Sequence, residues 1–375
     1  MAKTFIICEK PSAAAKIAAA LAEEKIAKKE LNGAPYYEFK RDGKQVIVSS
    51  ALGHLFTLKN LRPMKEYPVY DVDWMPTYKV DKKAAHTKPF VEAIQELSKG
   101  ADEFISATDY DTEGAVIGYN VLKFLCGEDS VKRAKRMKFS TLTTQDLRQA
   151  YDNPLPKLDF ELIDSGIARH VLDWYWGMNI SKAMSAAVES ACQRFAKLSA
   201  GRVQTPTLRV LAEREREIKA FKPEPFWVIS LLFEFDGQEV VAEHATPRFF
   251  DKKDAEKVRD ICKDKKAKVS AIQTQQYQQH PPIPFDLGTL QAEAYRCFRY
   301  TPMHTQQIAQ QLYDAAYISY PRTSNQKFPP TIDLAAILKH LRGISTYKKL
   351  VDTLLEQPVL VPTEGPKTDP AHPPI

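Results

Sequence analysis

The chain has 375 residues, a hydrophobic fraction of 44% and a formal net charge of +6. This length exceeds that of one ordinary core, so two or three globular domains are expected. No apolar run approaches ~18 residues, which excludes a membrane span. The start of the chain leads into a very short apolar run at residues 5–8, too short for a signal peptide, so we predict a cytoplasmic protein.

The positive charge is mild and permits nucleic-acid binding without requiring it. A dense basic run lies at residues 132–138, for which a solvated helix face is the ordinary interpretation. The cysteines are scattered singly and form no Cys-x-x-Cys pair, which argues against a zinc ribbon or a disulfide framework. We expect each of them to be a small buried apolar residue: Cys8, Cys126, Cys192, Cys262 and Cys297.

Strand and helix patterns alternate in the first 150 residues. Strands are predicted at 4–8, 45–49 and 103–107, and helices at 12–23 and from Gly114 to about Leu125. This alternation predicts a mostly parallel α/β sheet. Catalytic groups on such sheets gather at the carboxyl ends of strands, where Glu9 and Asp109 both fall.

The pattern after residue 150 is first helical, then β-rich, then helical again. Residues 158–191 read as long helices, with Arg169 and Asp173 on one face because they are four residues apart. A turn-like stretch and a charged helix follow, and residues 226–272 alternate like antiparallel strands. The remaining segments are a polar, proline-containing linker at 273–284, helices at about 286–298 and 303–316, and a proline-rich tail at 359–375.

Three acidic residues, Asp109, Asp111 and Glu113, lie between the third strand and the helix that Gly114 opens. Carboxylates spaced in this way repel one another unless a cation compensates them. Alternate residues of a strand-end loop can point one way, so the three can converge on one ion. Carboxylate oxygen is what Mg²⁺ prefers, and Mg²⁺ serves phosphoryl chemistry. A solvated acidic loop is the alternative, which the position after an apolar strand disfavours.

Tyr320 and Arg322 form the second constellation. A phenol has a pKa near 10 and needs cationic help to attack a phosphodiester. The guanidinium of Arg322 offers a fork of donors for a pentacovalent phosphate. At the first strand end, Glu9 is suited to moving a proton and Lys10 to binding phosphate or the leaving oxygen. Together these groups predict a protein that cuts and rejoins nucleic acid.

Four segments in this order carry a family resemblance. They read Phe-Ile-Ile-Cys-Glu-Lys-Pro-Ser at 5–12, Ser-Ala-Thr-Asp-Tyr-Asp-Thr-Glu-Gly at 106–114, Ser-Ala-Gly-Arg-Val-Gln-Thr-Pro at 199–206 and Tyr-Ile-Ser-Tyr-Pro-Arg-Thr-Ser at 317–324. The set resembles the signature motifs of type IA DNA topoisomerases, most of all the archaeal topoisomerase I and topoisomerase III branch. The resemblance spans nearly the whole chain.

The resemblance implies a role for each matching residue. It implies Tyr320 as the nucleophile of a 5′-phosphotyrosyl bond and Arg322 as the group that positions the scissile phosphate. It implies Glu9 as the proton-transfer residue, with Lys10 beside it. It also implies His372 as an active-site histidine that approaches Asp173 when DNA binds. It implies Asp109, Asp111 and Glu113 as the Mg²⁺ acids. The DNA-binding residues that it implies are Arg169 and Asp173 in the single-strand groove, Ser199, Arg202 and Gln204 in a backbone-contacting loop, and His54.

The resemblance also implies the architecture. We expect a multidomain α/β plus α fold, in which a Rossmann-like, mostly parallel Toprim domain precedes helical arch segments and a small β-rich domain. The expected divisions are a Toprim domain at 1–150, a helical groove segment at 151–220, a partial β-rich arch domain at 221–280 and a helical domain with the nucleophilic tyrosine at 281–375. Because the family's chain returns through the arch after the tyrosine domain, the sequence reads as an N-terminal fragment.

Two positions depart from the family pattern. Ala115 follows Glu113-Gly114, where many members have an acidic residue. Ala13 stands where bacterial topoisomerase I has a lysine, so Lys10 takes that role, as in topoisomerase III.

The predicted activity is Mg²⁺-dependent, ATP-independent breakage of one DNA strand, strand passage and religation, which relaxes negative supercoils or decatenates. The expected partners are single-stranded and negatively supercoiled DNA and a helicase, with no membrane, and the expected state is a nucleoid-associated monomer. For the fragment alone, cleavage without efficient relaxation is expected. Two alternatives stay open: a Toprim nuclease that uses Mg²⁺-bound water, and a single-strand-binding fragment without turnover.

Overall fold

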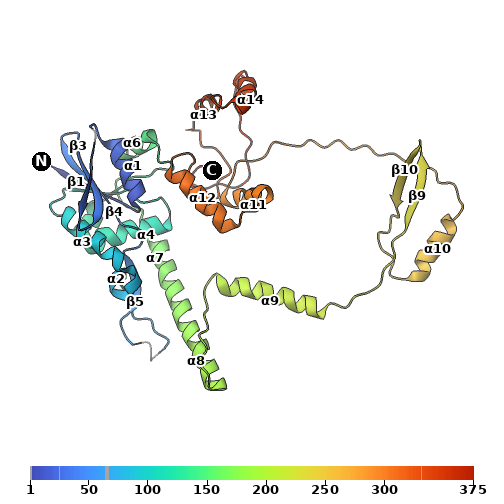
Figure 1. Cartoon of the computed structure of the whole chain (residues 1–375), viewed down its shortest axis with the longest axis horizontal. Helices are drawn as coiled ribbons and strands as arrows, with labels where there is room; N and C mark the ends of the chain where they lie inside the picture. Colours follow the sequence, from blue (N-terminus) through green and yellow to red (C-terminus); the bar gives the residue numbers. More distant parts are fainter. Residues whose placement is uncertain (1, 25, 64–66, 331) are drawn as a thin grey trace. The chain divides into compact units, whose positions relative to one another are not determined.

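The computed structural model describes residues 2–24, 26–63, 67–330 and 332–375. Contacts divide the chain into two compact units, each described separately below. One unit comprises residues 1–200 and 281–375, and the other comprises residues 201–280. Figure 1 draws the elements of both units. The four-domain division stays a prediction.

A six-stranded sheet forms the centre of the first unit, in the order β2-β3-β4-β1-β7-β8. Its strands are β1 (Lys3–Cys8), β2 (Lys28–Leu31), β3 (Ala34–Arg41), β4 (Lys44–Ser50), β7 (Glu103–Ser106) and β8 (Lys135–Arg136). The pairs β1–β4, β1–β7 and β7–β8 are parallel, whereas β2–β3 and β3–β4 are antiparallel. The predicted α/β fold with a mostly parallel sheet is therefore confirmed, with an antiparallel extension at one edge.

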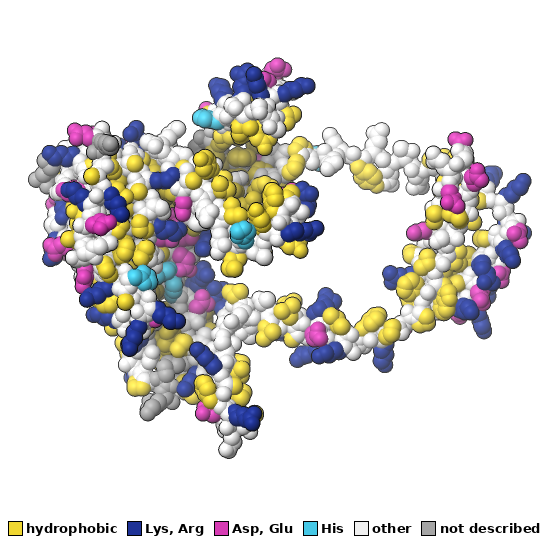
Figure 2. Space-filling view, in the orientation of Figure 1, with side chains coloured by type: hydrophobic (Ala, Val, Ile, Leu, Met, Phe, Trp, Pro, Cys, Tyr) yellow, Lys and Arg dark blue, Asp and Glu magenta, His cyan; other side chains and the backbone are white. Residues whose placement is uncertain are grey.

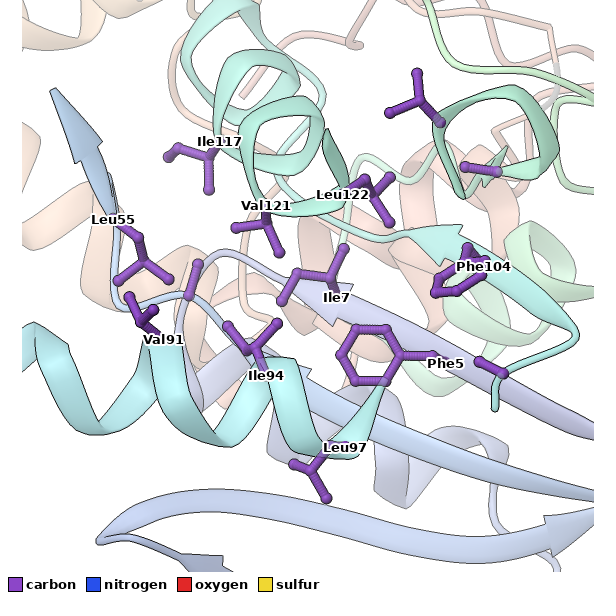
Figure 3. Packing of buried hydrophobic residues seen from close by; sticks show 14 of the residues in the cluster. Phe5, Ile7, Leu55, Val91, Ile94, Leu97, Phe104, Ile117, Val121 and Leu122 are labelled. Atoms are coloured by element: carbon purple, nitrogen blue, oxygen red, sulfur yellow. The ribbon is translucent and has the colours of Figure 1, made fainter. Parts of the chain in front are cut away.

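Helices cover both faces of this sheet. On β1, Phe5 and Ile7 pack with α3 (Lys88–Leu97) and α4 (Thr112–Val121), as Figure 3 shows. The alternate residues Ile6 and Cys8 belong to the cluster that includes buried residues of α1 (Pro11–Leu21) and α6 (Thr144–Asp152). Because successive side chains of a strand point to opposite faces, β1 is buried on both sides. The strand is thereby fixed, and so is the position of Glu9 directly after it.

Shorter elements join these layers. They are β5 (Phe56–Asn60), β6 (Val72–Pro76), α2 (Thr77–Val80), the 3-10 helix η1 (Lys82–Thr87), the π-helical turn η2 (Leu122–Cys126) and α5 (Glu128–Arg133). The strands β5 and β6 form an antiparallel pair of their own. None of the helices that the structure describes has the length and apolar character needed to cross a bilayer.

A long helical segment follows the sheet, as predicted. It consists of α7 (Phe160–Trp174), the π-helical η3 (Tyr175–Ile180) and α8 (Ser181–Cys192). Helix α7 lies directly against α4 at Gly166. A Cβ atom on Gly166 would lie 2.5 Å from Cγ2 of Val116 and 2.8 Å from the carbonyl oxygen of Thr112. The missing side chain therefore permits this close approach, one helical turn before His170.

The second half of the unit contains α11 (Leu287–Phe298), α12 (Pro302–Asp314), α13 (Leu334–Leu341) and α14 (Ser345–Leu355). Buried Asp286 holds it together at the start of α11. Its carboxylate accepts from the backbone N–H of Thr289 at 2.7 Å, from Nε2 of Gln326 at 3.1 Å and from Nζ of Lys367 at 2.8 Å. One side chain therefore connects three separate parts of residues 281–375.

Residues 201–280 form the second unit. It contains α9 (Gln204–Ala220), the antiparallel pair β9 (Ser230–Phe235) and β10 (Gln238–Glu243), and α10 (Lys252–Cys262). The predicted antiparallel strands are confirmed at 230–243, but the prediction is wrong further along residues 226–272, where α10 is a helix. Hydrophobic side chains gather along the hairpin in Figure 2, and Leu232, Phe235 and Val241 are about 60% exposed.

The cysteine prediction is wrong for three of the five residues. Cys8 is buried and Cys126 is half-buried, but Cys192, Cys262 and Cys297 are exposed. These three lie on α8, α10 and α11. Residue type alone does not distinguish a solvent-facing helical position from a buried one.

Replacing Gly166 with Ala is expected to destabilise the chain by about 1–3 kcal/mol, because the new Cβ meets backbone that cannot yield cheaply. Urea unfolding monitored by circular dichroism measures the change. Gly288→Ala is the matched control: its nearest neighbour is Oδ1 of Asp286 at 3.6 Å, an ordinary contact. Equal stability of the two variants would contradict the close packing of α4 against α7.

The hydrogen bonds to Asp286 predict a pH dependence of stability. Desolvation opposes ionisation, but Lys367 and Thr289 outweigh it and lower the pKa of Asp286 to about 2. A lowered folded-state pKa contributes stability above the unfolded pKa, here about 2 kcal/mol, which disappears as the pH falls towards 2. The free-energy difference between the wild type and Asp286→Asn should therefore shrink by roughly half of this contribution between pH 7 and pH 3. A difference that does not change with pH would refute the assignment.

Candidate active site

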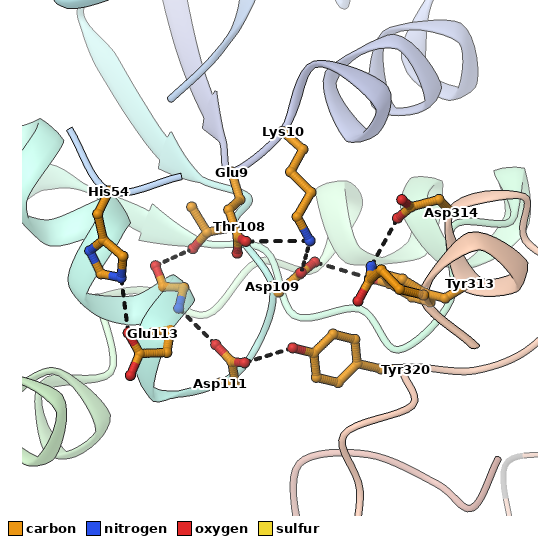
Figure 4. A network of polar contacts seen from close by, with 12 residues as sticks. Glu9, Lys10, His54, Thr108, Asp109, Asp111, Glu113, Tyr313, Asp314 and Tyr320 are labelled. Carbon is orange, nitrogen blue, oxygen red and sulfur yellow. Dashed lines mark hydrogen bonds and ion pairs between the residues drawn. The ribbon is translucent and has the colours of Figure 1, made fainter. Parts of the chain in front are cut away.

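Acidic side chains gather at the carboxyl edge of the sheet, where β1 and β7 end. Glu9 follows β1, and Asp109 lies three residues after the end of β7. Nζ of Lys10 lies 3.4 Å from Oε1 of Glu9 and 3.3 Å from Oδ2 of Asp109, as Figure 4 shows. Glu9 and Asp109 are thus neighbours, with one ammonium group between them.

This crowding changes how the groups ionise. Burial and the charge of Asp109 raise the pKa of Glu9 to about 7, and burial also raises the pKa of Asp109. For Lys10, burial alone would lower the pKa, but Asp109 and Glu9 outweigh it and raise the pKa. Glu9 can therefore exchange a proton near neutral pH, whereas Lys10 keeps its charge.

Asp111 connects the acidic loop to the start of α4. Its Oδ1 accepts from the backbone N–H of Gly114 at 2.7 Å, which caps the helix. A Cβ on Gly114 would lie 2.2 Å from the carbonyl oxygen of Asp109, so only glycine fits this turn. The hydroxyl of Tyr320 donates to Oδ2 of Asp111 at 2.6 Å. The loop and the tyrosine, 209 residues apart in sequence, thus meet at one carboxylate.

Glu113 has different neighbours. Its Oε2 lies 2.9 Å from Nε2 of His54 and 3.1 Å from Nε2 of His170, and its Oε1 lies 3.3 Å from Nη1 of Arg169. In Figure 4, Glu113 points towards His54 and away from Asp109. Burial opposes ionisation of Glu113, but the histidines and Arg169 outweigh this effect and lower the pKa of Glu113. Burial also lowers the pKa of His54.

The three predicted metal acids do not form a single ligand group in this structure. Within the described residues, the group of three potential metal ligands whose donor atoms lie within 4.8 Å of one another is His54, Glu113 and His170. Asp109, Asp111 and Glu113 follow one another on the loop, but Glu113 turns to the histidines. Their assignment as Mg²⁺ ligands stays a prediction.

Tyr320 is buried, with 3% of its surface exposed. Its backbone N–H donates to the carbonyl of Ser140 at 2.9 Å. The ring packs against those of Tyr313 and His372, with centroids 5.2 and 4.6 Å away. Burial, Asp111 and Asp109 raise the pKa of the Tyr320 phenol, so the hydroxyl is protonated in this arrangement.

Arg322, two residues further on, has an exposed side chain. Its Nε and Nη2 donate to the side-chain oxygen of Gln306 at 3.0 and 3.1 Å, in the amide orientation that satisfies both groups. The positive charge of Arg322 lowers the pKa of Tyr320, although less than burial and the aspartates raise it. Arg322 is thus near enough to influence the phenol and open enough to bind an anion.

His372 lies beside Tyr320 rather than in open solvent. Its Nε2 lies 3.0 Å from the carbonyl oxygen of Tyr110, and its Nδ1 lies 3.1 Å from Oγ of Ser140. Because a carbonyl only accepts, Nε2 carries the proton and Nδ1 accepts from the serine. Burial lowers the pKa of His372, which favours the neutral ring.

The predicted DNA-binding residues are distributed over both units. Arg169 is half-exposed and contacts Glu113 at 3.3 Å and Asp173 at 3.9 Å. Ser199 is exposed near the end of residues 1–200, whereas exposed Arg202 and Gln204 belong to the unit at 201–280. The backbone oxygen of His54 accepts from Oγ1 of Thr77 at 3.1 Å, which fixes its loop. Their role in binding DNA stays a prediction.

Sequence reasoning missed the residues that hold this site in place. Tyr313 donates to Oδ1 of Asp109 at 3.3 Å, and Ser140 contacts both Tyr320 and His372. The signals were weak: Tyr313 is a helical tyrosine seven residues before Tyr320, and His170 follows Arg169 directly.

Arg136 is the clearest of the missed residues. It is 2% exposed in β8, so the solvated-face interpretation of the basic run fails for this position. Its guanidinium donates to the carbonyls of Ser106, Thr108 and Asp109 at 3.1, 2.8 and 2.8 Å. Burial lowers its pKa to about 10. Arg136 therefore fixes the backbone from which the acidic side chains project.

The first unit has the layered sheet of a Toprim domain, with acidic groups at its carboxyl edge. Residues 4–142 match the Toprim domain model, and residues 157–375 match the model described as DNA topoisomerase. Toprim is a metal-binding domain. The chain is thus a Toprim protein with a tyrosine held against its acidic loop. It belongs to the type IA DNA topoisomerase family.

Individual relatives agree with this membership. The chain is 46% identical over 371 residues to DNA topoisomerase 1 of Pyrococcus horikoshii, covering 99% of this chain and 54% of the relative. It is 47% identical over 375 residues to DNA topoisomerase 1 of Methanocaldococcus jannaschii, covering 99% and 48%. The chain therefore spans about half the length of the curated relatives it matches.

A solved structure, full-length topoisomerase I from Thermotoga maritima, is also similar. Its TM-score is 0.59 at 26% identity, and the match covers 91% of this chain and 52% of that chain. The curated relatives and the solved structure are therefore similar to nearly all of the present chain.

Replacing Arg136 with Lys is expected to destabilise the chain by about 2 kcal/mol or more, because an ammonium group cannot reach three carbonyls and leaves buried acceptors unpaired. Thermal and urea unfolding measure the loss. Arg133→Lys, at an exposed position three residues earlier, is the control and should change stability by less than about 0.5 kcal/mol. If Arg136→Lys were equally mild, the guanidinium would not be holding the loop.

Proposed function

We propose that this chain carries the DNA-cleaving centre of a type IA topoisomerase. The whole reaction would be ATP-independent breakage of one strand, strand passage and religation, which relaxes negative supercoils or decatenates DNA. The observation that carries the proposal is the hydrogen bond from the Tyr320 hydroxyl to Oδ2 of Asp111, 2.6 Å long, beside Glu9 and Lys10. A nucleophile, an acceptor for its proton, a proton donor and a cation thus share one sheet edge.

The chemistry is a transesterification. The Tyr320 oxygen forms a bond to phosphorus and the bond from phosphorus to the 3′ oxygen breaks, which leaves a 5′-phosphotyrosyl link. The phenolic proton passes to Asp111, which already accepts it, and Glu9, with its pKa of about 7, gives a proton to the departing 3′ oxygen. Reversal of both transfers reseals the strand. Because the link conserves the phosphodiester energy, no ATP is needed.

Cations stabilise the charge that develops on the phosphate. Lys10 lies beside Glu9, where the leaving oxygen would sit, and Arg322 is exposed two residues after the nucleophile. The Arg322 guanidinium can release the side chain of Gln306 and bind two phosphate oxygens instead, because its N–H donors form a planar fork. His372, neutral and in contact with the Tyr320 ring, would orient the nucleophile.

The donor set fits a hard divalent cation. Buried carboxylates whose pKa values are raised by burial and mutual repulsion form the type of environment that Mg²⁺ relieves. We propose Asp109, Asp111 and Glu113 as the residues that hold Mg²⁺, with Glu113 leaving its histidine partners. When bound, Mg²⁺ would neutralise phosphate charge at this edge.

We propose single-stranded and negatively supercoiled DNA as the substrate, because underwinding supplies the single strand. Arg169 and Asp173 on α7, and Ser199, Arg202 and Gln204 after α8, would contact its backbone, with His54 nearby. The four domain divisions at 1–150, 151–220, 221–280 and 281–375 are part of the proposal. So are a monomeric state, a helicase partner and a cytoplasmic, nucleoid-associated location.

Replacing Tyr320 with Phe should abolish the covalent adduct, with a loss of at least ~10³-fold, because it removes the hydroxyl that donates to Asp111. The measurement uses end-labelled single-stranded DNA, Mg²⁺ and denaturing electrophoresis, in which the adduct appears as labelled protein. Tyr317→Phe is the matched control, since Tyr317 is 80% exposed three residues earlier. That variant should keep adduct formation.

The same experiment separates the two alternatives. If Tyr320→Phe still cut the labelled strand, hydrolysis by a Toprim nuclease would replace the proposal. If the folded wild-type chain bound the strand without any adduct, the chain would be a binding module.

A further inference from the structure

His54, Glu113 and His170 form a cluster that the proposed strand cleavage does not use as such. Three elements supply it: the loop between β4 and β5, the first turn of α4, and α7. Both imidazole Nε2 atoms lie against the same carboxylate oxygen, at 2.9 and 3.1 Å. The two rings meet edge to face with centroids 4.9 Å apart. Two nitrogen donors and one oxygen donor therefore face a common point.

We propose that His54, Glu113 and His170 form a binding site for a transition-metal ion of the Zn²⁺ type, separate in its chemistry from the Mg²⁺ site.

The distances suit this ion. Ligands about 2.0–2.2 Å from a tetrahedral Zn²⁺ lie roughly 3.3–3.6 Å from one another. The observed nitrogen-to-oxygen distances are 2.9 and 3.1 Å, and all three donor atoms lie within 4.8 Å of one another. Each nitrogen would separate from the carboxylate oxygen by a few tenths of an ångström, with the ring protons moved to Nδ1, to reach this ligand spacing. Side-chain exposures of 31, 26 and 29% leave access for the ion and for a water in the fourth position.

The surroundings hold the two rings in place. Oγ1 of Thr77 donates to the backbone oxygen of His54, and the ring of Trp74 packs edge to face on His170 with centroids 5.5 Å apart. Gly166 keeps α7 close to α4, one turn before His170. Arg169 is a competing cation, but it contacts Oε1 of Glu113 and leaves Oε2 to the histidines. The ligands are therefore already arranged, so few rotamers need to be ordered on binding.

The choice of donors favours Zn²⁺ over Mg²⁺. Imidazole nitrogen suits Zn²⁺, Co²⁺ and Cu²⁺, whereas Mg²⁺ prefers oxygen donors and water. The same carboxylate cannot serve both sites at once. A consequence that rests on the proposed function is that Zn²⁺ would hold Glu113 away from the Mg²⁺ site and lower the yield of covalent adduct.

The test is metal binding to the full chain, with Cys192, Cys262 and Cys297 replaced by Ser because exposed thiols also bind Zn²⁺. Co²⁺ titration should give the visible absorption of a low-coordinate site, and Zn²⁺ should displace it at one ion per chain. A large excess of Mg²⁺ should not displace the Co²⁺. Competition with a chromogenic chelator then measures the Zn²⁺ affinity.

His170→Gln is expected to weaken Zn²⁺ binding at least about tenfold, since it removes one ligand. His86→Gln is the matched control because His86 is exposed and lies outside the cluster. Circular dichroism checks the fold, and His54→Gln replaces His170→Gln if the latter does not fold. Equal Zn²⁺ affinity in wild type and both cluster variants, or no binding by the wild type, would overturn the proposal.

The Tyr320→Phe chain separates this inference from the proposed function. It should bind Zn²⁺ with wild-type affinity although it forms no adduct. If the wild-type chain binds Zn²⁺ through His54 and His170 but never forms an adduct, the metal site stands and the proposed cleavage fails.

Discussion

The crowding of carboxylates at the carboxyl edge of β1 and β7 is the constraint on which the remaining features of the site depend. Glu9 and Asp109 are largely buried with Lys10 between them, and Asp111 lies two residues further along the loop. Like charges in such a place favour the protonated form or require cations. The charge of Asp111 is partly compensated, because its carboxylate accepts hydrogen bonds from the backbone N–H of Gly114, at the start of α4, and from the Tyr320 hydroxyl. Arg136, buried beneath the loop, adds positive charge without occupying the carboxylates.

The same crowding explains why the structure is a closed state of the proposed enzyme. The Tyr320 hydroxyl satisfies Asp111, and the aromatic rings of Tyr313 and His372 cover the phenol. Burial of the phenol beneath these rings, and not the hydrogen bond itself, keeps a phosphodiester away from the Tyr320 oxygen. DNA entry on this proposal therefore requires the tyrosine segment to separate from the acidic loop.

The contacts that would have to break comprise apolar packing, because Tyr313 and Tyr320 belong to one hydrophobic cluster with residues of β1 and α1, and several hydrogen bonds. They include the Tyr320 N–H to the carbonyl of Ser140, the pair of bonds made by His372, and Nζ of Lys138 to the carbonyl of Pro370 at 3.1 Å. Such groups exchange protein partners for water at a modest net cost of about 1 kcal/mol each. Asp286, in contrast, makes its hydrogen bonds within residues 281–375 and stabilises that region internally.

The sequence was most informative where chemistry and local pattern coincide. Strands β1, β4 and β7 are short apolar runs. Glu9 follows β1 directly and Asp109 lies three residues after β7, so their shared edge was predictable from the parallel topology. The β2–β3–β4 hairpins were missed, although Asn32-Gly33 and Asp42-Gly43 are typical hairpin turns, with positive φ at all four residues. These two turns are therefore local signals for the antiparallel edge of the sheet.

Other features have no local signal. Nothing in the basic run distinguishes Arg136 from its exposed neighbour Arg133, because its burial results from β8 pairing with β7. The contact of His170 with Glu113 depends on how closely α7 approaches α4, which is a tertiary property set at Gly166. The exposure of Cys192, Cys262 and Cys297 is likewise decided by which helical face meets a neighbour. These properties require the packed structure.

Glu113 shows how one side chain can belong to two arrangements. As the last acid of the loop it follows Asp109 and Asp111, and on the proposed Mg²⁺ assignment its side chain would turn towards them to complete an oxygen-rich set. In the present structure, two imidazoles and Arg169 hold it on the opposite side, and these neighbours lower its pKa. Moving Glu113 to the loop acids means leaving three favourable partners for a region of like charge. A cation at the loop, or protonation of the loop acids, can compensate that change, so the position of Glu113 should report whether the acidic edge is charged or neutralised.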